Sequence, residues 1–377
     1  MNKPRIIAFY LPQFHPIPEN DKWWGKGFTE WNNVVKAKSR FWGHNQPHFP
    51  SDLGFYDLRL EETRIAQADL AKQYGVYGFC YYHYWFNGKM LLERPFNDVL
   101  SSGKPDFPFC LCWANENWTR RWDGLESEIL MKQNYDEYDP ELHIKWLSSA
   151  FADRRYIKIN DRPIFLVYNP SGINNLLDII NKWKKKIKEL GYSGIYLCAV
   201  KSVHNKLVDS DLMNYGFDAV LNFMPPHYSI LPAKKLPSIP RWVLSSFFNK
   251  LVKLFNLERK IGKLPVVSVH SYNALVKKII NSPVSDYKTF FCVMPGWDNS
   301  PRTKFSVVIQ NDDVNNFKKW LMHAFERTKN YPDEEKIVFI NAWNEWAEGC
   351  YLEPDLRNGR KFLESILYVV DNWRPNL

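Results

Sequence analysis

The chain has 377 residues, of which 45% are hydrophobic and 16% aromatic, including 16 Trp and 20 Tyr. This length and composition allow a large buried core in a soluble globular protein, and no apolar run is long enough to span a bilayer. The formal net charge of +9 at pH 7 indicates an anionic partner: a nucleotide diphosphate, a phospholipid surface, an acidic glycan or nucleic acid. Nucleic acid ranks last of these, because no nucleic-acid-binding motif accompanies the charge.

Short apolar runs alternate with helical patterns along the whole chain. The predicted strands are Arg5–Leu11, Gly78–Trp85, Phe107–Trp113, Pro163–Tyr168, Ile195–Val200, Ala219–Phe223, Thr289–Met294 and Lys336–Ala342. The predicted helices are Leu60–Tyr74, Arg94–Ser101, Pro140–Asp153, Gly172–Leu190, Asn273–Asn281, Asp313–Lys329 and Gly359–Asn372. Continuous apolar strands that alternate with helices are typical of parallel strands buried on both faces. Eight of them predict an α/β fold, a single (β/α)₈ TIM-type barrel over residues 1–377 with extended loops at its C-terminal face.

The barrel prediction is weakest after the sixth strand. No clear helix follows Ala219–Phe223, and the strand-like run Pro265–His270 competes for one of the eight positions. Residues 228–263 are predicted to form an insertion, in which Arg241–Phe255 carries apolar residues at helical spacing together with several Lys and Arg. Two interpretations of this basic amphipathic helix stay open: its apolar stripe packs on the barrel, or it rests on an anionic membrane surface.

The N-terminus and the cysteines bear on location and on bound groups. The chain passes from Met1–Arg5 directly into the first predicted strand, with no signal peptide. Five of the six cysteines lie in predicted strands, where Cys acts as a small buried hydrophobe, so we expect reduced thiols in a cytoplasmic protein. The sequence has no zinc-ligand spacing and no H-E-x-x-H, G-x-G-x-x-G or Walker motif, so we expect no metal and no cofactor.

The run Phe339–Gly349 ends a predicted strand in two carboxylates, Glu345 and Glu348, flanked by tryptophans. If the chain turns helically after Asn344, both carboxyl groups lie on one face. Cleavage of a glycosidic bond needs such a pair, one carboxyl to protonate the leaving oxygen and one to act as base or nucleophile. Repulsion within a close pair raises one pKa and lowers the other. The alternative is a pair of solvated residues at the start of a surface helix.

Polar and aromatic residues also follow the other predicted strands, and in a barrel the C-terminal strand ends meet at one rim. We therefore predict Glu345 and Glu348 as catalytic residues with a substrate cleft around them. The predicted substrate-binding residues are His15, Trp31, His83, Trp85, Trp113, Asn115, Glu116, Trp118, His227, Trp297, Asp298, Asn344 and Trp346. Simpler explanations stay open: a histidine can be buried and hydrogen-bonded, a tryptophan can pack in the core, and Asp298 can cap a turn. Glu30 can serve only to brace the long first loop.

Five motifs occur in one order along the chain: Tyr10–Pro16, Trp24–Trp31, Tyr81–Phe86, Trp113–Trp118 and Asn344–Gly349. Together they resemble the WbsX family, whose members are described as glycosyltransferases of bacterial surface-polysaccharide assembly, that is, of O-antigen and lipopolysaccharide. The resemblance runs from about residue 5 to residue 370. That family is similar in turn to glycoside hydrolase family 99, the (β/α)₈ endo-α-mannosidases, whose catalytic motif N-E-W-x-E-G matches Asn344–Gly349.

The similarity to family 99 implies a mechanism for the two carboxylates. Glu345 would remove the proton of the sugar 2-hydroxyl, so that this oxygen attacks the anomeric carbon and forms a 1,2-anhydro sugar. Glu348 would protonate the leaving group and afterwards activate the acceptor, with retention of the anomeric configuration. The spacing alone fits a conventional nucleophile and acid–base pair equally well.

These observations predict a carbohydrate-active enzyme that makes or breaks a glycosidic bond with retention. A glycosyltransferase of surface-polysaccharide biosynthesis is favoured, acting on an oligosaccharide or an activated sugar with a lipid-linked partner, in the cytoplasm or at the inner face of the cell membrane. Two alternatives stay open. One is an endo-acting hydrolase of the endo-α-mannosidase type, and the other is a non-catalytic glycan-binding barrel, against which the intact Glu pair argues.

Overall fold

The structure, a computed structural model, describes residues 2–120, 125–226, 233–237, 266–283, 285–311 and 313–375. Three features predicted from the sequence lie wholly or mostly outside these residues. They are the insertion at residues 228–263, of which only 233–237 are described, the amphipathic helix Arg241–Phe255, and the candidate ligand-binding residue His227.

Eight parallel strands close into a barrel, and the predicted (β/α)₈ fold is confirmed. The strands are β1 (Arg5–Tyr10), β2 (Gly78–Phe86), β4 (Phe109–Trp113), β8 (Arg162–Val167), β9 (Tyr196–Val200), β10 (Ala219–Asn222), β13 (Thr289–Val293) and β16 (Ile337–Ile340). They follow one another around the barrel in chain order, and β1 closes it by pairing with both β2 and β16. Each coincides with a predicted strand to within about two residues, because continuous apolar runs of this length suit strands buried on both faces.

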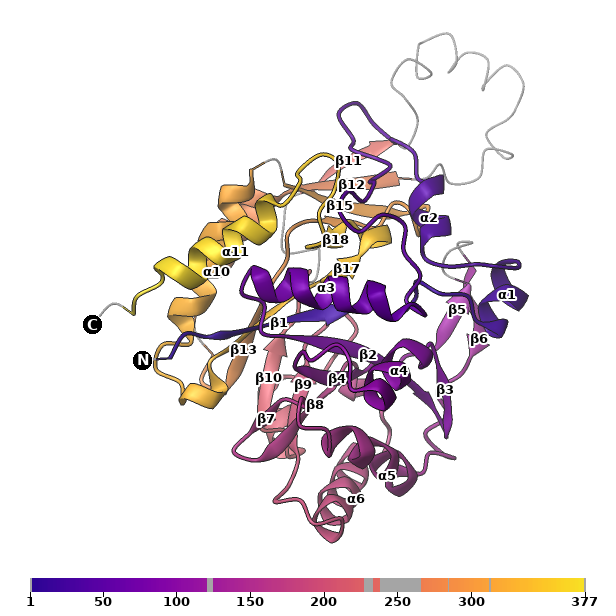
Figure 1. Ribbon diagram of the computed structural model, residues 1–377, viewed down its shortest axis with the longest axis vertical. Coiled ribbons are helices and arrows are strands. Elements are labelled where there is room, and N and C mark those ends of the chain that lie inside the picture. The colour runs from indigo at the N-terminus through magenta and orange to yellow at the C-terminus, as the bar shows by residue number, and fades with distance from the viewer. Residues whose placement is uncertain are drawn as a thin grey trace.

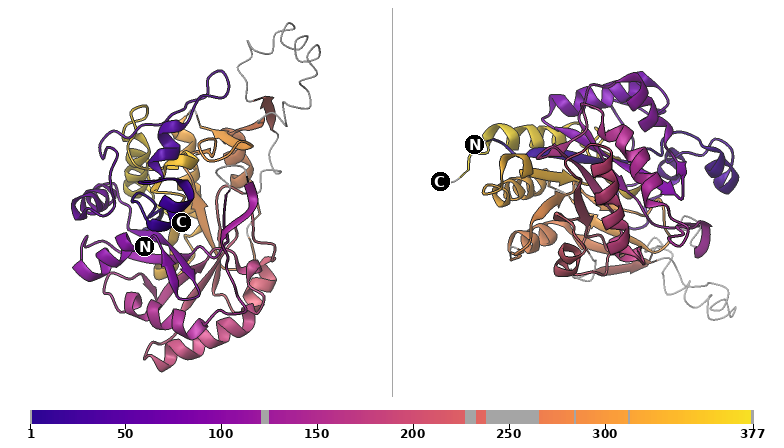
Figure 2. Two further views of the ribbon diagram at one scale, coloured as in Figure 1. Left: turned by 90° about the vertical axis from the view of Figure 1, so that its right-hand side faces the viewer. Right: turned by 90° about the horizontal axis from the view of Figure 1, so that it is seen from below.

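Helices surround these strands on the outside, as the two views in Figure 2 show. Within the described residues they are α1 (Pro18–Trp24), α2 (Trp31–Lys36), α3 (Glu61–Gln73), α4 (Arg94–Ser102), α5 (Pro140–Phe151), α6 (Leu176–Glu189), α7 (Asp209–Asn214), α9 (Tyr272–Ile280), α10 (Val314–Arg327) and α11 (Lys361–Asn372). In Figure 1, α5 and α6 lie side by side below the barrel, and α10 and α11 pack together at its upper left. All seven predicted helices are present, and α1, α2 and α7 are additional short ones.

A second, four-stranded sheet lies above the barrel in Figure 1. It consists of β11 (Lys234–Pro237), β12 (Val266–Ser271), β15 (Ser306–Gln310) and β14 (Trp297–Asp298). The run Pro265–His270 competed for a barrel position; its described residues, 266–270, belong to β12 of this sheet and displace no barrel strand. Strands β12, β14 and β15 come from the connections after β10 and β13, so the sheet extends the C-terminal rim.

Shorter elements complete the loops. They are β3 (Lys89–Leu91), β5 (Trp118–Arg120), β6 (Leu125–Met131), β7 (Lys158–Ile159), β17 (Asn344–Glu345), β18 (Cys350–Tyr351) and the 3₁₀ turns Pro170–Gly172, Asp333–Glu335 and Trp346–Glu348. Strands β5 and β6 form one hairpin, and β17 and β18 form another directly after the eighth barrel strand.

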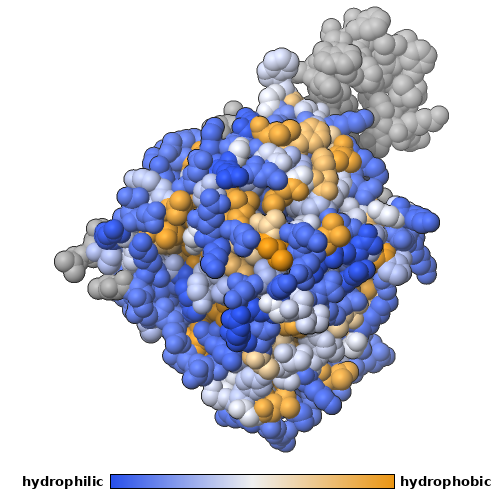
Figure 3. Space-filling model, in the orientation of Figure 1, coloured by the Kyte–Doolittle hydropathy of each residue, from blue (hydrophilic) through white to orange (hydrophobic). Residues whose placement is uncertain are grey.

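The core consists mainly of strand residues. All four residues of β16 are fully buried, and so are most residues of β1, β4 and β9. All six cysteines are buried and free, in agreement with their predicted role as small hydrophobes. The face drawn in Figure 3 is largely hydrophilic, with apolar residues in small groups between the charged ones. Over the described residues, no helix combines the length and the apolarity that crossing a bilayer requires.

Candidate active site

The two predicted catalytic glutamates lie on a tight turn after the eighth barrel strand. Glu345 ends β17 and Glu348 ends the 3₁₀ turn Trp346–Glu348. Their two carboxyl groups lie on the same side of the turn, since both contact the guanidinium of Arg302. Gly349 ends the turn at φ +56°, and a Cβ there would lie 2.9 Å from the Cβ of Asp298. This position therefore requires glycine, for its conformation and for the close approach.

A single guanidinium joins three carboxylates at this turn. Arg302, in the connection between β14 and β15, donates from Nε to Oε1 of Glu30 (2.6 Å) and from NH2 to Oε2 of Glu345 (2.9 Å). Its NH1 lies 2.7 Å from Oε1 of Glu348. The Arg302 side chain is 13% exposed and that of Glu30 is completely buried. The loop after the first barrel strand, the turn after the eighth strand and the hairpin after the seventh strand thus meet at one cation.

Burial and the surplus of acidic groups shift the pKa values of this cluster. The pKa of Glu345 rises to about 8, chiefly through burial and also through repulsion by Glu348 and Glu30, while Arg302 opposes the rise. Burial likewise raises the pKa of Glu30, against the attraction of Arg302. Burial acts to lower the pKa of Arg302, but the three carboxylates outweigh it and hold that pKa above its usual range. At neutral pH the cluster therefore retains at least one proton that ordinary carboxyl groups would have lost.

Glu345, Glu348 and Arg302 line a cavity of about 530 Å³. Its wall is largely aromatic: Tyr82, Tyr84, Trp118, Tyr168, Phe223, Trp297 and Phe305. Burial, with Glu345 contributing, raises the pKa of both Tyr82 and Tyr84, so these phenols stay protonated and can donate hydrogen bonds. Flat apolar rings with hydroxyl groups at their edges suit a sugar, which has an apolar C–H face and a polar rim.

A second cavity of about 500 Å³ adjoins the first one. The two share Glu116, Asn117 and His204. The second cavity is rich in carboxamides, and those that line it are Asn115, Asn117, Gln133, Asn134, Asn169 and Asn174. Together the two form one continuous groove, with the carboxylate pair in its aromatic part and amide donors and acceptors in the other part.

Buried hydrogen bonds hold the turn that carries the glutamates. The side chain of Asn344 accepts from the backbone N of Leu11 (2.8 Å) and donates to the backbone O of Leu11 (3.0 Å), which ties β17 to the end of β1. The carboxylate of Glu353 accepts from Trp346 Nε1 (2.6 Å), Tyr56 Oη (2.8 Å) and Gln67 Nε2 (2.7 Å). Both sides of the turn are therefore fixed to the barrel.

The family model described as glycosyltransferase WbsX matches residues 6–366. The chain belongs to this family. Two relatives from strains of Xanthomonas campestris pv. campestris, both called uncharacterized protein WxcX, are 39% and 38% identical to it over 362 residues, which is 96% of this chain and 48% of each relative. The chain thus spans about half the length of the curated relatives it matches.

Solved structures with the same fold include the GH99 endo-α-mannosidase from Bacteroides thetaiotaomicron, in complex with bis-tris propane, with a TM-score of 0.55 and 11% identity over 97% of this chain and 96% of that one. Another is a glycoside hydrolase-like protein with a TM-score of 0.55 and 12% identity over 98% and 94% of the two chains. The predicted resemblance to the WbsX family is confirmed, and the structural likeness shows that the fold is shared.

Five of the predicted site residues line the aromatic cavity of this WbsX-family chain: Glu116, Trp118, Trp297, Glu345 and Glu348. Asn115 lines the adjoining cavity, where its amide is held by Tyr135 Oη (2.8 Å) and the backbone of Asn169. Asp298 lies on the far side of the Trp297 strand. Its carboxylate binds His44 Nε2 and Gln46 Nε2, both at 2.7 Å, so it faces a different pocket.

His83, Trp85 and Trp113 are buried, and none of them is among the residues that line the two cavities. His83 is hydrogen-bonded to His143 (Nε2 to Nε2, 2.9 Å), and burial lowers the pKa of His83 to about 3. The ring of Trp85 stacks on His143 at 4.6 Å between centroids, and that of Trp113 on Tyr138 at 5.2 Å. These large rings fill the space between the barrel and α5, where they exclude water from the core.

Four more predicted residues support the rim from within the protein. Trp31 donates from Nε1 to the backbone O of Tyr56 (2.8 Å), and Trp346 stacks on Tyr351 at 3.8 Å between centroids. Asn344 is fully buried in its bonds to Leu11. His15 is also buried, and burial lowers its pKa to about 4, so it is neutral at pH 7. None of these four side chains is among the residues that line the aromatic cavity or the adjoining one.

Sequence reasoning missed several residues that the structure brings to the carboxylate pair. Tyr82, Tyr84 and Tyr168 sit at the ends of barrel strands, a signal that was present in the sequence. Arg302 lies well beyond the seventh strand, and only the β14–β15 hairpin returns it to the rim. Glu30, explained from sequence as a loop brace, is an ion-pair partner of Arg302. No cluster of three or more potential metal ligands occurs among the residues that the structure describes.

Glu353 makes a testable contribution to stability. Burial raises its pKa to about 7, against the hydrogen bonds from Trp346, Gln67 and Tyr56, which lower it. Because this pKa lies above the ordinary value of 4.5, the stability that protonated Glu353 provides is complete below about pH 4.5 and is lost as the pH rises to about 7. In Glu353→Gln, which cannot ionise, we expect no such loss. The free energy of unfolding of the wild type, relative to the variant, should fall by up to about 1.4 kcal/mol per pH unit in this window.

Urea denaturation at several pH values would measure this difference, with the exposed Glu364→Gln as the matched control. An equal difference between wild type and Glu353→Gln at pH 5 and pH 7.5 would contradict the raised pKa.

Proposed function

We propose that this protein is a retaining glycosyltransferase of bacterial surface-polysaccharide biosynthesis, that is, of O-antigen or lipopolysaccharide. The observation that carries the proposal is the pair Glu345 and Glu348, bound to one guanidinium in a cavity walled by tyrosine and tryptophan. Membership of the WbsX family supports it. The continuous groove supports a substrate of more than one sugar unit, either an oligosaccharide or an activated sugar on a lipid carrier.

We assign the base to Glu345 in the first half of the reaction. Its carboxylate removes the proton of the 2-hydroxyl group of the donor sugar, and the C2 oxygen attacks the anomeric carbon while the bond to the leaving oxygen breaks. Glu348 gives its proton to that leaving oxygen. A carboxylate whose pKa is raised to about 8 holds a proton more firmly than an ordinary one, which suits it to take a proton from a sugar hydroxyl.

The second half returns both protons. The hydroxyl group of the acceptor attacks the anomeric carbon of the 1,2-anhydro sugar and gives its proton to Glu348, while Glu345 returns a proton to the C2 oxygen. Two inversions at the anomeric carbon give net retention. Tyr82 and Tyr84, protonated and close to Glu345, are placed to hold sugar hydroxyls during both steps.

Transfer and hydrolysis share the first half and differ in whether a sugar or water accepts. In the presence of donor and acceptor, transfer gives a longer glycan, whereas an endo-acting hydrolase of the endo-α-mannosidase type releases a free reducing end. Mass spectrometry of the products from isolated surface glycans and their lipid-linked precursors distinguishes the two. A non-catalytic glycan-binding barrel would give neither product.

Replacement of either glutamate should abolish turnover. Glu345→Gln and Glu348→Gln keep the shape of the side chain but remove proton transfer, which contributes roughly 10²–10⁴-fold to such reactions. We expect kcat to fall by that factor while glycan affinity and folding are largely retained. The exposed Glu62→Gln serves as the matched control. Near-normal rates in both active-site variants would exclude the assignment.

The dependence of kcat/KM on pH tests whether Glu345 acts as the base or as the acid. As a base it must be ionised, so kcat/KM should rise as the pH increases through about 8. Arg302 opposes the rise of this pKa, so Arg302→Gln should move the ascending limb upward by roughly 1–3 pH units. Arg302→Lys keeps the charge and should leave the limb near its wild-type position while reducing kcat. A rate that falls as the pH rises through 8 would instead make Glu345 the acid.

We also propose a cytoplasmic enzyme that reaches the inner face of the cell membrane through the basic sequence segment Arg241–Phe255. The support is the sequence alone, where each basic residue near an anionic surface contributes about 1 kcal/mol. We expect the protein to co-sediment with vesicles that contain anionic lipid, to be released by salt, and to bind less when Lys250 and Lys253 are changed to Glu. Absence of binding at low salt would reject the membrane contact.

A further inference from the structure

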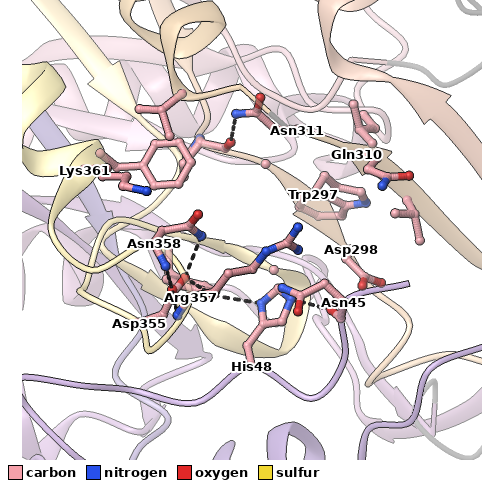
Figure 4. A pocket seen from close by; sticks show the side chains of 18 of the residues that line it. Asn45, His48, Trp297, Asp298, Gln310, Asn311, Asp355, Arg357, Asn358 and Lys361 are labelled. Atoms are coloured by element: carbon pink, nitrogen blue, oxygen red, sulfur yellow. Dashed lines mark hydrogen bonds between the residues drawn. The ribbon is translucent and has the colours of Figure 1, made fainter. Parts of the chain in front are cut away.

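A third pocket, of about 310 Å³, lies behind the turn that carries the catalytic pair. Trp297 and Gly349 form part of its wall, and Trp297 also lines the aromatic cavity, so the two spaces are separated by the Trp297 strand. Figure 4 shows the pocket between β14, the connection that carries Asn45 and His48, and the start of α11. Its volume is at the lower end for small-molecule sites and suits one sugar unit rather than a chain.

The acidic side chains of this pocket are already satisfied. Asp298 accepts from His44, from Gln46 and from the backbone N of Ser300 (2.9 Å). It remains ionised, because these partners outweigh the effect of burial and lower its pKa.

Asp355 is satisfied in the same way. It accepts from Tyr351 Oη (2.8 Å), from Nδ2 of Asn358 and from the backbone N–H groups of Arg357 and Asn358. The carboxylates of Asp298 and Asp355 therefore bind residues of the pocket wall.

The basic side chains of the pocket have no such partner. Neither Arg357 nor Lys361 forms an ion pair or a side-chain hydrogen bond with any residue that the structure describes. Figure 4 shows the guanidinium of Arg357 extending across the pocket toward Trp297, and the ammonium of Lys361 entering from α11. Two cations thus line one pocket, and neither forms an ion pair with the described part of the chain.

The remaining polar groups are neutral and suited to hydroxyls. Asn45, Gln310, Asn311 and Asn358 supply amide groups to the lining. The indole N–H of Trp297 is buried without a hydrogen-bond partner among the described residues, and in Figure 4 it lies beside Gln310. An aromatic ring, amides and an unused indole donor are groups that bind sugar hydroxyls and the apolar face of a ring.

The position of this pocket in the fold is typical of anion-binding sites. The pocket is built from the connections after the seventh and eighth barrel strands and from the first turn of α11, to which Lys361 and Phe362 belong. In (β/α)₈ barrels this is the place where phosphate groups are frequently bound, because the loops after strands seven and eight bring backbone N–H groups and a helix N-terminus together.

We propose that this pocket is a second binding site for a single anionic sugar, with its phosphate or carboxylate group between Arg357 and Lys361 and its ring against Trp297. Arg357 can form two parallel hydrogen bonds to either anion, and Lys361 adds a point charge. The site is separate from the groove that holds Glu345 and Glu348. Ligand binding to this site can be measured without any turnover. The result therefore tests this proposal independently of the proposed glycosyl transfer.

The test is calorimetric titration of the full chain with glucose 1-phosphate, glucuronic acid and glucose, at low and at physiological salt. We expect glucose 1-phosphate to bind at least tenfold more tightly than glucose, and Arg357→Gln and Lys361→Gln each to remove most of that advantage. Arg360→Gln is the matched control, since Arg360 is the adjacent basic residue but pairs with Asp52 (2.5 Å) outside the pocket. Glucuronic acid binding as tightly as glucose 1-phosphate supports the anion site with a carboxylated sugar as its ligand.

Arg302→Gln separates this site from the catalytic cavity, where Arg302 is the cation. Binding that survives in Arg302→Gln and is lost in Arg357→Gln supports the pocket. Binding that is lost in Arg302→Gln and kept in Arg357→Gln overturns the proposal. So does equal affinity for glucose and glucose 1-phosphate, or the same weakening in Arg360→Gln as in Arg357→Gln. Quenching of Trp297 fluorescence, compared in Trp297→Phe, gives a second readout for folded variants.

Discussion

The candidate active site depends on one buried guanidinium that binds three carboxylates. Removal of a charge from water is unfavourable unless it is paired, and Arg302 pairs with Glu30, Glu345 and Glu348. Burial raises the pKa values of Glu30 and Glu345, and because one cation cannot neutralise three anions, repulsion among the carboxylates adds to the rise. The same imbalance that makes the cluster costly to bury gives it protons to exchange. The burial of three carboxylates around one guanidinium therefore determines both how this site is held together and which of its groups keep protons.

The connections after the seventh and eighth barrel strands form one unit rather than two separate loops. Gly349 approaches Asp298 so closely that no side chain fits between them, and Trp297 lines both the aromatic cavity and the pocket of Arg357 and Lys361. A shift of the β14–β15 hairpin would move Arg302 and Trp297 together. The positions of the carboxylate pair, the aromatic wall and the second pocket therefore depend on one another through the same two connections.

The barrel could be predicted from the sequence because each strand is recognisable from a few consecutive residues. Each of the eight strands is a short apolar run, and such a run has few alternatives when helices flank it. The carboxylate pair was also visible, since Glu345 and Glu348 are neighbours in the sequence. The aromatic residues were harder to assign, because Trp85 and Trp113 fill a core for the same reason that Trp118 and Trp297 line a cavity: each offers a large apolar surface with one polar group. Only their position relative to the strand ends decides between the two.

Arg302 could not be predicted because its place depends on pairing between distant segments. It lies between β14 and β15, which pair with each other, and β15 also pairs with β12, a strand that follows β10 rather than β13. The carboxylates themselves have little freedom, since Asn344 fixes one side of their turn to Leu11 and Glu353 fixes the other through Trp346. Among the described contacts, Arg302 binds one oxygen of each of the two carboxylates, Oε2 of Glu345 and Oε1 of Glu348. Arg302 therefore fixes both carboxyl groups through one oxygen each and leaves the second oxygen of each outside these contacts.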